Sequence, residues 1–598
     1  MCGIFGLFNS APSDEKLDAM EKALHHRGPD GKGRLKRMYS GIGMTRLSIL
    51  DDRLGHQPFF SANGRVAAVF NGEIYNWRAL REELRALGHH FRTECDGEVI
   101  PAAWEQWGPE MLERFRGMFA IALMDGEKLF LARDPVGQKP LYLASLSDGS
   151  HAFASEIAGI RAAGHPLNIN FTALEHWLAL RYVPEPATLL QGIKTLPAGH
   201  HFQWQPGKDP KIRRWWKPPS RHGDSNLSDA DALSDLGELV DDCTHQALQS
   251  DHPIACYLSS GIDSALLLDS IQRAGGTCET ITAGFGDSSG EIEHAALMAD
   301  HFGYKHHQVR LDASHLDELP RVIRQMGTPV ADGLILAFDA LGKATADLGC
   351  PVALGGEGPD ELFRGYSFQQ SLERAEKLGS KGRKVAATWV KHAPQSWLDA
   401  RTPLPTSIGK AGRQKIQQWL AHYDRSTPWE KGMGLRTLFS PHEIRDLLLE
   451  PLWIEPPLAQ APDLIDQHHR QQFIEWLPDW SIIRQDRNAM AHSVEYRMPF
   501  LDPAMIHFSG QLQANQKIRG RSGKWIWREL AKARLPRISA RRPKEPFYFP
   551  LEKFSQSSQW KTLVGDLLSK DKLNEDYIFR AESVERLKQG ASTGEFLP

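Results

Sequence analysis

The stretch of sequence that decides the fold runs Ile254-Ala255-Cys256-Tyr257-Leu258-Ser259-Ser260-Gly261-Ile262-Asp263-Ser264. Its apolar first half predicts a short buried strand, and its second half predicts a loop followed by a helix from Ser264. Hydroxyl groups, a glycine and exposed N–H groups at a helix start form an anion site that suits phosphate. We therefore expect a nucleotide-binding loop here, although the string alone is also compatible with an ordinary serine-capped helix.

The same strand–loop–helix pattern recurs further along the chain. A second apolar strand is expected at Thr280–Phe285, before a helix over Glu291–Phe302, and a third at Val352–Leu354, before another glycine-rich loop. Such repetition is typical of a parallel sheet whose loops at the carboxyl ends of the strands bind ligand. From about residue 366 onward the sequence favours helices, with Trp and Leu spaced for packing.

The first part of the chain, up to about residue 200, is instead rich in predicted strands. Turn dipeptides separate apolar runs at Asn63-Gly64 and at Asp125-Gly126, which is the pattern of β-hairpins. Helical periodicity appears over Trp77–Leu87 and over 98–107. Stacked hairpins flanked by helices predict a layered α+β domain.

The chain length and its punctuation predict the domain organisation. A chain of 598 residues is too long for one hydrophobic core and implies at least two domains. Prolines and glycines among polar residues mark a linker over 206–230. We therefore expect one domain over 1–205 and a second over 231–598.

Bulk composition excludes several classes of protein. Apolar residues make up 41% and charged residues 24%, as in ordinary globular proteins, and the net charge of −3 gives no reason to expect a nucleic-acid partner. We find no apolar run long enough to span a bilayer and no convincing signal peptide, so no membrane partner is expected. The six cysteines are scattered without zinc-like spacing, which favours a reducing, cytoplasmic location.

Cys2 carries the most information in the first domain. Removal of Met1 would leave its thiol beside a free α-amine, whose pKa of roughly 7.7–8.0 suits a general base near neutrality. The thiolate could then attack an amide carbonyl and release ammonia. A cysteine at the second position is by itself as compatible with chance as with catalysis, so the surrounding motifs decide.

Five motifs follow one another in order: Met1-Cys2-Gly3-Ile4-Phe5-Gly6, His26-Arg27-Gly28-Pro29-Asp30, Arg46-Leu47-Ser48-Ile49-Leu50-Asp51, Phe70-Asn71-Gly72-Glu73-Ile74-Tyr75-Asn76 and Asp96-Gly97-Glu98. Together they resemble the glutaminase domain of the class II amidotransferases, a family of N-terminal-nucleophile hydrolases. The resemblance implies a sandwich of two antiparallel sheets between helices, with Cys2 as the nucleophile and Asn71 and Gly72 as the oxyanion hole.

The same resemblance assigns the groups that would bind glutamine. Arg46 would grip the α-carboxylate, Asp96 would accept from the α-ammonium, and Glu73 would line the pocket. Without the motifs, Arg46 and Asp96 would be interpreted as solvated surface charges. Arg27 lies in a loop that the family places near the domain interface.

In the second domain, the loop at 257–264 resembles the PP-loop of N-type ATP pyrophosphatases, which cleave ATP to AMP and pyrophosphate. The partner motif is Gly355-Gly356-Glu357-Gly358-Pro359-Asp360-Glu361-Leu362-Phe363-Arg364-Gly365-Tyr366, which resembles the SGEGSDExFGGY segment of asparagine synthetases. The resemblance implies that Asp263 and Asp360 hold Mg²⁺ on the pyrophosphate. Glu357 would face a β-aspartyl-AMP intermediate and assist attack by ammonia.

The ATP co-substrate would be framed by the residues of these two loops and one strand, namely Leu258, Ser259, Ser260, Gly261, Asp263, Ser264, Ala283, Gly355 and Gly356. Ser260 stands where a PP-loop usually carries glycine, and we expect it to narrow the backbone freedom of the loop. The run Gly520-Arg521-Ser522-Gly523-Lys524 has only a superficial likeness to a Walker A loop and lacks its spacing.

Two later stretches extend the likeness. Residues 486–502 match a long family signature, and residues 541–547 match the region that carries a lysine near the reactive phosphates. By this likeness Lys544 would neutralise charge on the α-phosphate during adenylation. A lone lysine would otherwise be interpreted as a solvated surface residue.

The resemblance therefore implies an N-terminal-nucleophile hydrolase sandwich followed by an α/β PP-loop ATP pyrophosphatase domain with a helical extension. The implied reaction converts aspartate, glutamine, ATP and water to asparagine, glutamate, AMP and pyrophosphate, with ammonia passing unprotonated through the interior. A homodimer is the family expectation.

Two other functions stay open. One is amidation of a sugar carboxylate or a peptide, because four residues depart from the commonest asparagine synthetase pattern: Ser260, Gly355, Pro359 and Arg364. The other is a non-catalytic binding or regulatory protein on the same fold. Retention of every expected nucleophile, donor and Mg²⁺ ligand argues against the second.

Overall fold

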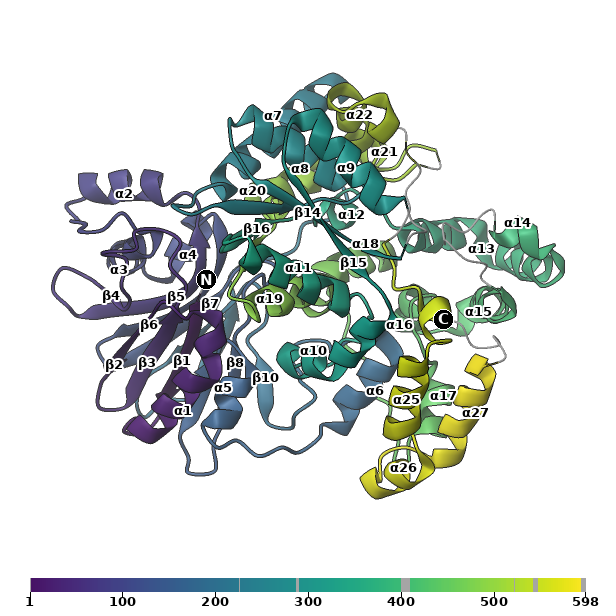
Figure 1. Ribbon diagram of the computed structural model, residues 1–598, viewed down its shortest axis with the longest axis horizontal. Coiled ribbons are helices and arrows are strands. Elements are labelled where there is room, and N and C mark those ends of the chain that lie inside the picture. Colours follow the sequence, from purple (N-terminus) through teal and green to yellow (C-terminus); the bar gives the residue numbers. More distant parts are fainter. Residues whose placement is uncertain are drawn as a thin grey trace.

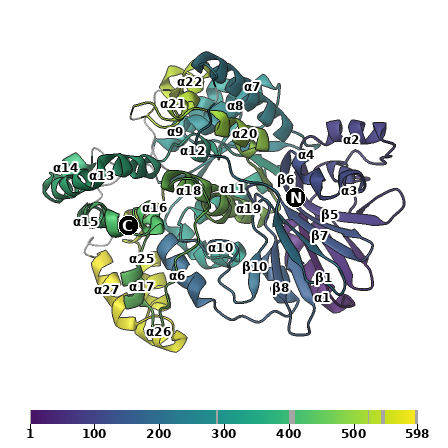
Figure 2. The same cartoon turned by 180° about the vertical axis from the view of Figure 1, so that it is seen from behind.

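The computed structural model describes residues 2–224, 226–286, 290–399, 409–520, 522–540, 542 and 547–592. In Figure 1 the amino-terminal part, in purple and blue, packs against a larger part that runs from teal to yellow. The amino-terminal end of the chain lies where the two parts meet, as the view from behind in Figure 2 also shows.

The amino-terminal part contains two six-stranded sheets, each wholly antiparallel. The first sheet has the order β10-β8-β9-β1-β3-β2 and is formed by β1 (Cys2–Phe8), β2 (Gly31–Lys36), β3 (Ser40–Arg46), β8 (Tyr142–Ser145), β9 (His151–Ala154) and β10 (Ile193–Thr195). The second has the order β12-β11-β7-β6-β5-β4 and is formed by β4 (Phe59–Phe60), β5 (Val66–Ile74), β6 (Gly117–Asp125), β7 (Lys128–Arg133), β11 (His200–Trp204) and β12 (Lys211–Arg214).

Alternation along the strands explains why these sheets form layers. Side chains such as Ile4, Met44 and Val69 point to the inner face and form one buried cluster between the sheets. Helices α1 (Asp14–Leu24) and α5 (Ile157–Ala162) pack on the outer face of the first sheet. Helices α2 (Trp77–Ala86) and α3 (Val99–Trp107) pack on that of the second. The predicted sandwich of two antiparallel sheets between helices is confirmed.

The segment that the sequence marks as a linker, 206–230, contains β12, which pairs with β11. The backbone of Trp215 also donates to the carbonyl of Gly199. The sheets of the amino-terminal part therefore continue to about residue 216. Helix α7 (Asp229–Ala247) begins the second part, with Ser228 as its N-cap.

The second part is built on a parallel sheet with the order β15-β14-β13-β16-β17. Its strands are β13 (Ile254–Tyr257), β14 (Glu279–Phe285), β15 (His306–Leu311), β16 (Val352–Leu354) and β17 (Glu495–Arg497). Helices α8 (Ile262–Arg273) and α9 (Glu291–Phe302) lie on one face, and α11 (Ile335–Asp347) and α19 (Ile483–Met490) on the other (Figure 1). The predicted α/β domain is confirmed, whereas β17 was not predicted.

Further helices form an extension beside the parallel sheet (Figure 2). They include α13 (Ser367–His392), α15 (Gly409–His422), α25 (Ser558–Leu567) and α27 (Ala581–Ser592). No helix in the described ranges is both long and apolar enough to cross a membrane.

Candidate active sites

Sheet register places the amino-terminal candidate residues together. Cys2 opens β1 and lies opposite Arg46 on β3, because these two strands pair in antiparallel register. The backbone N–H of Cys2 donates to Oδ1 of Asn71, on β5, across 3.1 Å. Burial raises the pKa of the Cys2 thiol, so the thiol needs an adjacent base to become a nucleophile near neutrality.

Asn71 and Gly72 are consecutive residues of β5, and each has unusual surroundings. Asn71 is fully buried, and its Nδ2 has no hydrogen-bond partner within the part of the chain that the structure describes. A buried donor left unpaired is costly unless a ligand uses it. Gly72 has φ +148°, and a Cβ there would lie 1.9 Å from the carbonyl oxygen of Met118. Only glycine fits at this position.

Arg46 is held by the loop that follows β3. Its guanidinium donates to the carbonyl oxygens of Leu50 at 3.1 Å, Asp51 at 2.9 Å and Asp52 at 3.3 Å. The residue is 5% exposed. Backbone carbonyls thus fix the plane of the Arg46 guanidinium, as two-point recognition of a carboxylate requires.

Asp96 and Glu73 bring negative charge close to this site. Asp96 accepts from the backbone N–H of Ile74 at 2.8 Å, and burial raises its pKa to about 6. Glu73 forms a 3.1 Å ion pair with Arg497, which belongs to β17 of the other part of the chain. Burial, together with the charge of Asp96, raises the pKa of Glu73. The predicted glutamine pocket therefore adjoins the second domain directly.

Gln57 belongs to the same site and was missed in the sequence. Its Oε1 accepts from the N–H of Phe70 at 2.7 Å, and its Nε2 lies 3.7 Å from the sulfur of Cys2. Gln57 belongs to no motif, and it reaches Cys2 only because its loop folds onto β5. The local sequence contains no signal that could have found it.

The second candidate site begins where β13 ends. The N–H of Ser259 donates to Oγ of Ser264 at 3.0 Å, and the N–H of Gly261 donates to Oγ of Ser259 at 3.1 Å. The N–H of Leu258 extends the pairing to Ile281 of β14. The loop is therefore closed by its own hydroxyl groups at the start of α8.

Ser260 stands where a PP-loop usually carries glycine, and its effect on the backbone freedom of the loop stays a prediction. It is absent from the residues with positive φ, so its backbone has no need of glycine. Its N–H and its hydroxyl both donate to Glu291 of α9, each at 3.2 Å. The serine thus fastens the loop to the neighbouring helix.

A second loop, after β16, meets the first. A Cβ on Gly356 would lie 2.9 Å from the backbone of both Asp263 and Ser264, so the close approach depends on glycine. Gly355 donates its N–H to the carbonyl of Arg497 at 3.0 Å. Ala283 is 5% exposed within β14, the strand beside β13. The predicted ATP-framing residues therefore gather at the carboxyl ends of three adjacent parallel strands.

The carboxylates of Asp263 and Asp360 converge on one buried lysine, Lys524. Its Nζ lies 2.7 Å from Asp263 and 3.1 Å from Asp360, and the residue is 2% exposed. The sequence interpretation had dismissed the run ending at Lys524 and had assigned the phosphate lysine to Lys544, which lies outside the described residues. The nearby glycines, which allow close backbone approach, were the only sequence signal.

The site also fits a divalent cation bound together with phosphate. Asp263 and Asp360 already reach a common positive charge, that of the Lys524 ammonium. Within the described ranges, no three His, Cys, Asp or Glu side chains form a group that could hold a metal ion alone. Mg²⁺ typically binds through one or two carboxylates, several waters and substrate phosphates. The donor set suits Mg²⁺ that arrives with a nucleotide.

Glu357 lies beyond Gly356 and is held at both carboxylate oxygens. Gln485 of α19 donates to its Oε1 at 2.9 Å, and the hydroxyl of Tyr496 donates to its Oε2 at 2.6 Å. Burial raises the pKa of Glu357.

Buried charges join the two parts around these sites. Arg27 is fully buried and donates to Glu156 at 2.8 Å and to Asp486 of α19 at 3.0 Å. Lys139 donates to the backbone carbonyl of Tyr496 at 3.2 Å. The expectation that Arg27 lies near the domain interface matches this geometry.

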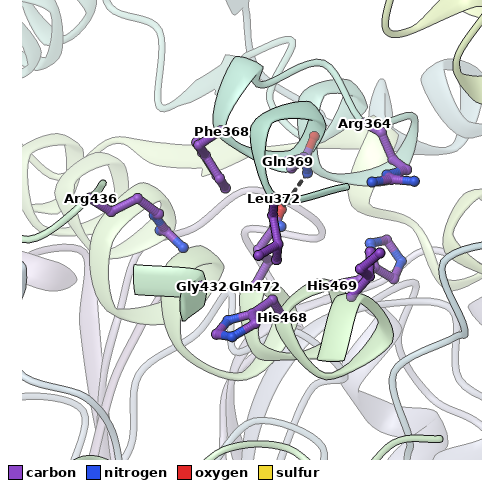
Figure 3. Close-up of a pocket in the computed structure, with 10 residues that line it drawn as sticks. Arg364, Phe368, Gln369, Leu372, Gly432, Arg436, His468, His469 and Gln472 are labelled. Carbon is purple, nitrogen blue, oxygen red and sulfur yellow. Dashed lines mark hydrogen bonds between the residues drawn. The ribbon is translucent and has the colours of Figure 1, made fainter. Parts of the chain in front are cut away.

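A small pocket lies within the helical extension (Figure 3). Its lining mixes polar and apolar residues and consists of Arg364, Phe368, Gln369, Leu372, Gly432, Arg436, Ile465, His468, His469 and Gln472. Arg364 pairs with Glu373 of α13. Arg364, which departs from the family segment, therefore pairs with a residue of the helical extension rather than with one of the nucleotide-binding loops.

Known families match almost the whole chain. The family described as glutamine amidotransferase domain matches residues 1–216, and the family described as asparagine synthase matches residues 235–596. Among solved structures, the glutamine phosphoribosylpyrophosphate amidotransferase from Bacillus subtilis is 18% identical over 51% of this chain and 65% of its own. Its TM-score of 0.29 is too low to support an argument.

Two curated relatives span nearly the full length. Asparagine synthetase (glutamine-hydrolysing) 1 of Bacillus subtilis is 27% identical over 97% of this chain and 92% of its own. A Mycobacterium bovis protein, named as a candidate glutamine-hydrolysing asparagine synthetase, is 32% identical over 94% and 89% respectively.

Proposed function

Because this chain belongs to the asparagine synthase family, we propose that it makes asparagine from aspartate, glutamine and ATP. One observation carries the proposal above all. The chain presents a nucleophile site around Cys2 and a carboxylate–lysine site around Asp263, and β17 contacts both neighbourhoods through Arg497 and Tyr496. Such an arrangement suits an enzyme that produces ammonia at one site and consumes it at the other.

At the first site, the α-amine of Cys2, freed by removal of Met1, takes the proton of the thiol, and the sulfur attacks the amide carbon of glutamine. Asn71 Nδ2 and the N–H of Gly72 stabilise the oxyanion, the α-ammonium gives its proton to the amide nitrogen, and ammonia leaves. Water then cleaves the thioester to glutamate. The unpaired Nδ2 of Asn71 supports this role.

At the second site, the aspartate side-chain carboxylate attacks the α-phosphorus of ATP, giving β-aspartyl-AMP and pyrophosphate. Ser259, Gly261 and Ser264 would turn to the phosphates the hydroxyl and N–H groups that close the loop in this structure. Asp263 and Asp360 would hold Mg²⁺, which when bound neutralises charge on the departing pyrophosphate. Lys524 adds a fixed positive charge beside them.

Ammonia then attacks the acyl carbon of the adenylate, and AMP leaves. The carboxylate of Glu357 takes the proton that the attacking nitrogen loses. Its raised pKa brings this base closer to neutrality. The six cysteines, all free, fit action in a reducing cytoplasm.

A larger acceptor, such as a sugar acid or peptide, would need an open groove with exposed aromatic platforms. Several tryptophans of the extension are instead packed in the core: Trp429 is 3% and Trp480 6% exposed. Trp476 and Trp480 stack on each other. This packing argues against an aromatic platform built from these three tryptophans, whereas Trp389 and Trp397 of the extension are 44% and 54% exposed.

The test is a product analysis by mass spectrometry. The enzyme is incubated with glutamine, ATP and Mg²⁺, with aspartate and without it. Asparagine, AMP and pyrophosphate should appear in equal amounts only when aspartate is present. Glutamate without asparagine would reject aspartate as the acceptor and would direct the search to larger carboxylates.

A further inference from the structure

We propose that Tyr496 is a positioning residue for the synthetase reaction: its hydroxyl holds the carboxylate of Glu357 in the orientation that receives the proton of the attacking ammonia. The inference rests on the proposed function, because it assigns a partner to Glu357 in that reaction. Tyr496 itself is not required to touch the substrate.

The first support is the geometry of the carboxylate. The Tyr496 hydroxyl lies 2.6 Å from Oε2 of Glu357, and Gln485 donates to Oε1 at 2.9 Å. A carboxyl group held at one oxygen can still swing about its terminal torsion, which is broad. Bonds to both oxygens define its plane, and the lone pairs left on each oxygen remain available for the reaction.

The second support is a steric match with Gly355. A Cβ at position 355 would lie 1.5 Å from Oη of Tyr496 and 2.4 Å from Oε2 of Glu357. Any side chain there would displace the hydroxyl from the carboxylate. The family segment carries serine at this position, so the departure to glycine in this chain has a physical reason: it makes room for the tyrosine.

The third support is the way in which the ring is held. Tyr496 is 1% exposed and stacks on Tyr257 with ring centroids 5.2 Å apart. Lys139 of the first domain donates to its backbone carbonyl. Successive residues of a strand point to opposite faces, so Glu495 and Arg497 pair with each other on one face while Tyr496 points to Glu357. Both domains therefore fix the hydroxyl.

The chemistry follows from the charges that face Glu357. Arg484 of α19 favours its ionised form, whereas Asp263 at the start of α8 opposes it. Tyr257 and Cys256 of β13 are the other titratable groups near it. The hydroxyl of Tyr496 donates to the carboxylate and so favours the ionised form, which is the form that can accept a proton.

The test is Tyr496→Phe, which removes the hydroxyl and keeps the ring. The rate of asparagine formation should fall about tenfold or more, as expected for loss of a hydrogen bond to a charged group. The acid limb of its pH profile should move to higher pH, because the pKa of Glu357 rises without the donor. Glutaminase activity and single-turnover pyrophosphate release, measured with aspartate and no nitrogen donor, should match the wild type.

Tyr304→Phe is the matched control, because its hydroxyl bonds the carbonyl of Gly276 and not a site residue. It should behave as the wild type in every assay. Asparagine formation by Tyr496→Phe at the wild-type rate, with an unshifted pH profile, would overturn the inference. Equal loss of all three activities would overturn it too, because the tyrosine would then be only structural.

A double-mutant cycle tests the steric match independently. Gly355→Ala should slow asparagine formation in the wild-type background, because the new Cβ displaces the hydroxyl. In a Tyr496→Ala background the same change should add little further loss. Additive effects would contradict the match. If the wild type itself makes no asparagine, the proposed function fails and this inference falls with it; if the wild type does and Tyr496→Phe does equally, only the inference fails.

Discussion

Asp263 and Asp360 share one buried ammonium group, that of Lys524. We therefore expect adenylation to depend on this lysine. Lys524→Met keeps most of the side-chain volume but leaves two carboxylates facing each other without their counter-charge. Pyrophosphate release should fall by about 100-fold or more, the usual effect of losing one group that stabilises transition-state charge. Glutamine hydrolysis should continue.

The control is Lys532→Met, in which an exposed lysine paired only with Glu529 is changed in the same way. It should leave both activities at the wild-type level. Pyrophosphate release by Lys524→Met at a rate close to the wild type would show that Lys524 has no part in adenylation.

Asp96 makes glutamine binding dependent on pH. Burial raises its pKa to about 6, so its carboxylate is ionised at neutral pH and is protonated as the pH falls below about 6. Only the ionised form attracts the α-ammonium of glutamine. The KM of the glutaminase for glutamine should therefore rise steeply between pH 6 and pH 5, approaching tenfold per pH unit.

Steady-state glutaminase assays across this range provide the measurement. In Asp96→Asn the KM should be high throughout and nearly independent of pH. A constant wild-type KM from pH 7 to pH 5 would remove Asp96 from the binding of the ammonium group.

Within β5 and the turn before it, two glycines differ in how much room a side chain would have. Gly72 in β5 has φ +148° and no room for a Cβ, whereas Gly64 in the preceding turn has φ +69° and no atom within 4 Å. Gly72→Ala should lower the free energy of unfolding by more than the roughly 1–3 kcal/mol of backbone strain and should abolish glutaminase activity. Gly64→Ala should cost about 1 kcal/mol and leave the activity intact.

Thermal unfolding midpoints and glutaminase rates, measured on both variants, decide this prediction. Both positions have a positive φ, but the strain at φ +148° exceeds that at φ +69°, so only a loss in Gly72→Ala beyond the roughly 1–3 kcal/mol of backbone strain reports the close approach to Met118. Equal losses in both would mean that the clash is relieved by movement of β6.

Most elements could be predicted because their signals are local. Turn dipeptides marked the hairpin between β4 and β5 and that between β6 and β7, and apolar runs before glycine-rich loops marked β13, β14 and β16. Strand β12 escaped because its four residues are all exposed and three of them are basic, and only pairing with β11 makes them a strand. Strand β17 escaped because three residues have too little periodicity.

The residues of the two candidate sites divide in the same way into those that the sequence predicts and those that it does not. Cys2, Asn71 and Glu357 stand in motifs whose order in the chain carries the information. Gln57 and Lys524 are brought to their sites by contacts across 55 and 261 residues of sequence, which no local pattern records. Long-range ion pairs and hydrogen bonds of this kind are read from the structure alone.

At the scale of the whole molecule, buried ion pairs hold the two domains together beside both sites. Arg27 and Arg487 each contact Glu156 of the first domain, and Arg27 also contacts Asp486 of the second. Breaking one partner of a buried pair commonly costs about 3–5 kcal/mol, because the other charge is left uncompensated. The interface is therefore specific, and it keeps Cys2 and Glu357 in a fixed relation through β17.

This fixed relation has a consequence for the route of nitrogen. Ammonia released in bulk solution near neutral pH is largely protonated and cannot act as a nucleophile. Because β17 contacts both neighbourhoods, we propose that the enzyme delivers ammonia directly from Cys2 to the adenylate beside Glu357.

The most direct test traces the amide nitrogen of glutamine with ¹⁵N. The enzyme is given aspartate, ATP, Mg²⁺ and glutamine labelled with ¹⁵N in its amide, with unlabelled ammonium chloride at the same concentration as glutamine. Cys2→Ala serves as the control, and it should make only unlabelled asparagine from the added ammonia. Wild-type asparagine should carry ¹⁵N in nearly every amide group; asparagine whose label is diluted to that of the ammonia in solution would contradict direct transfer between the two sites.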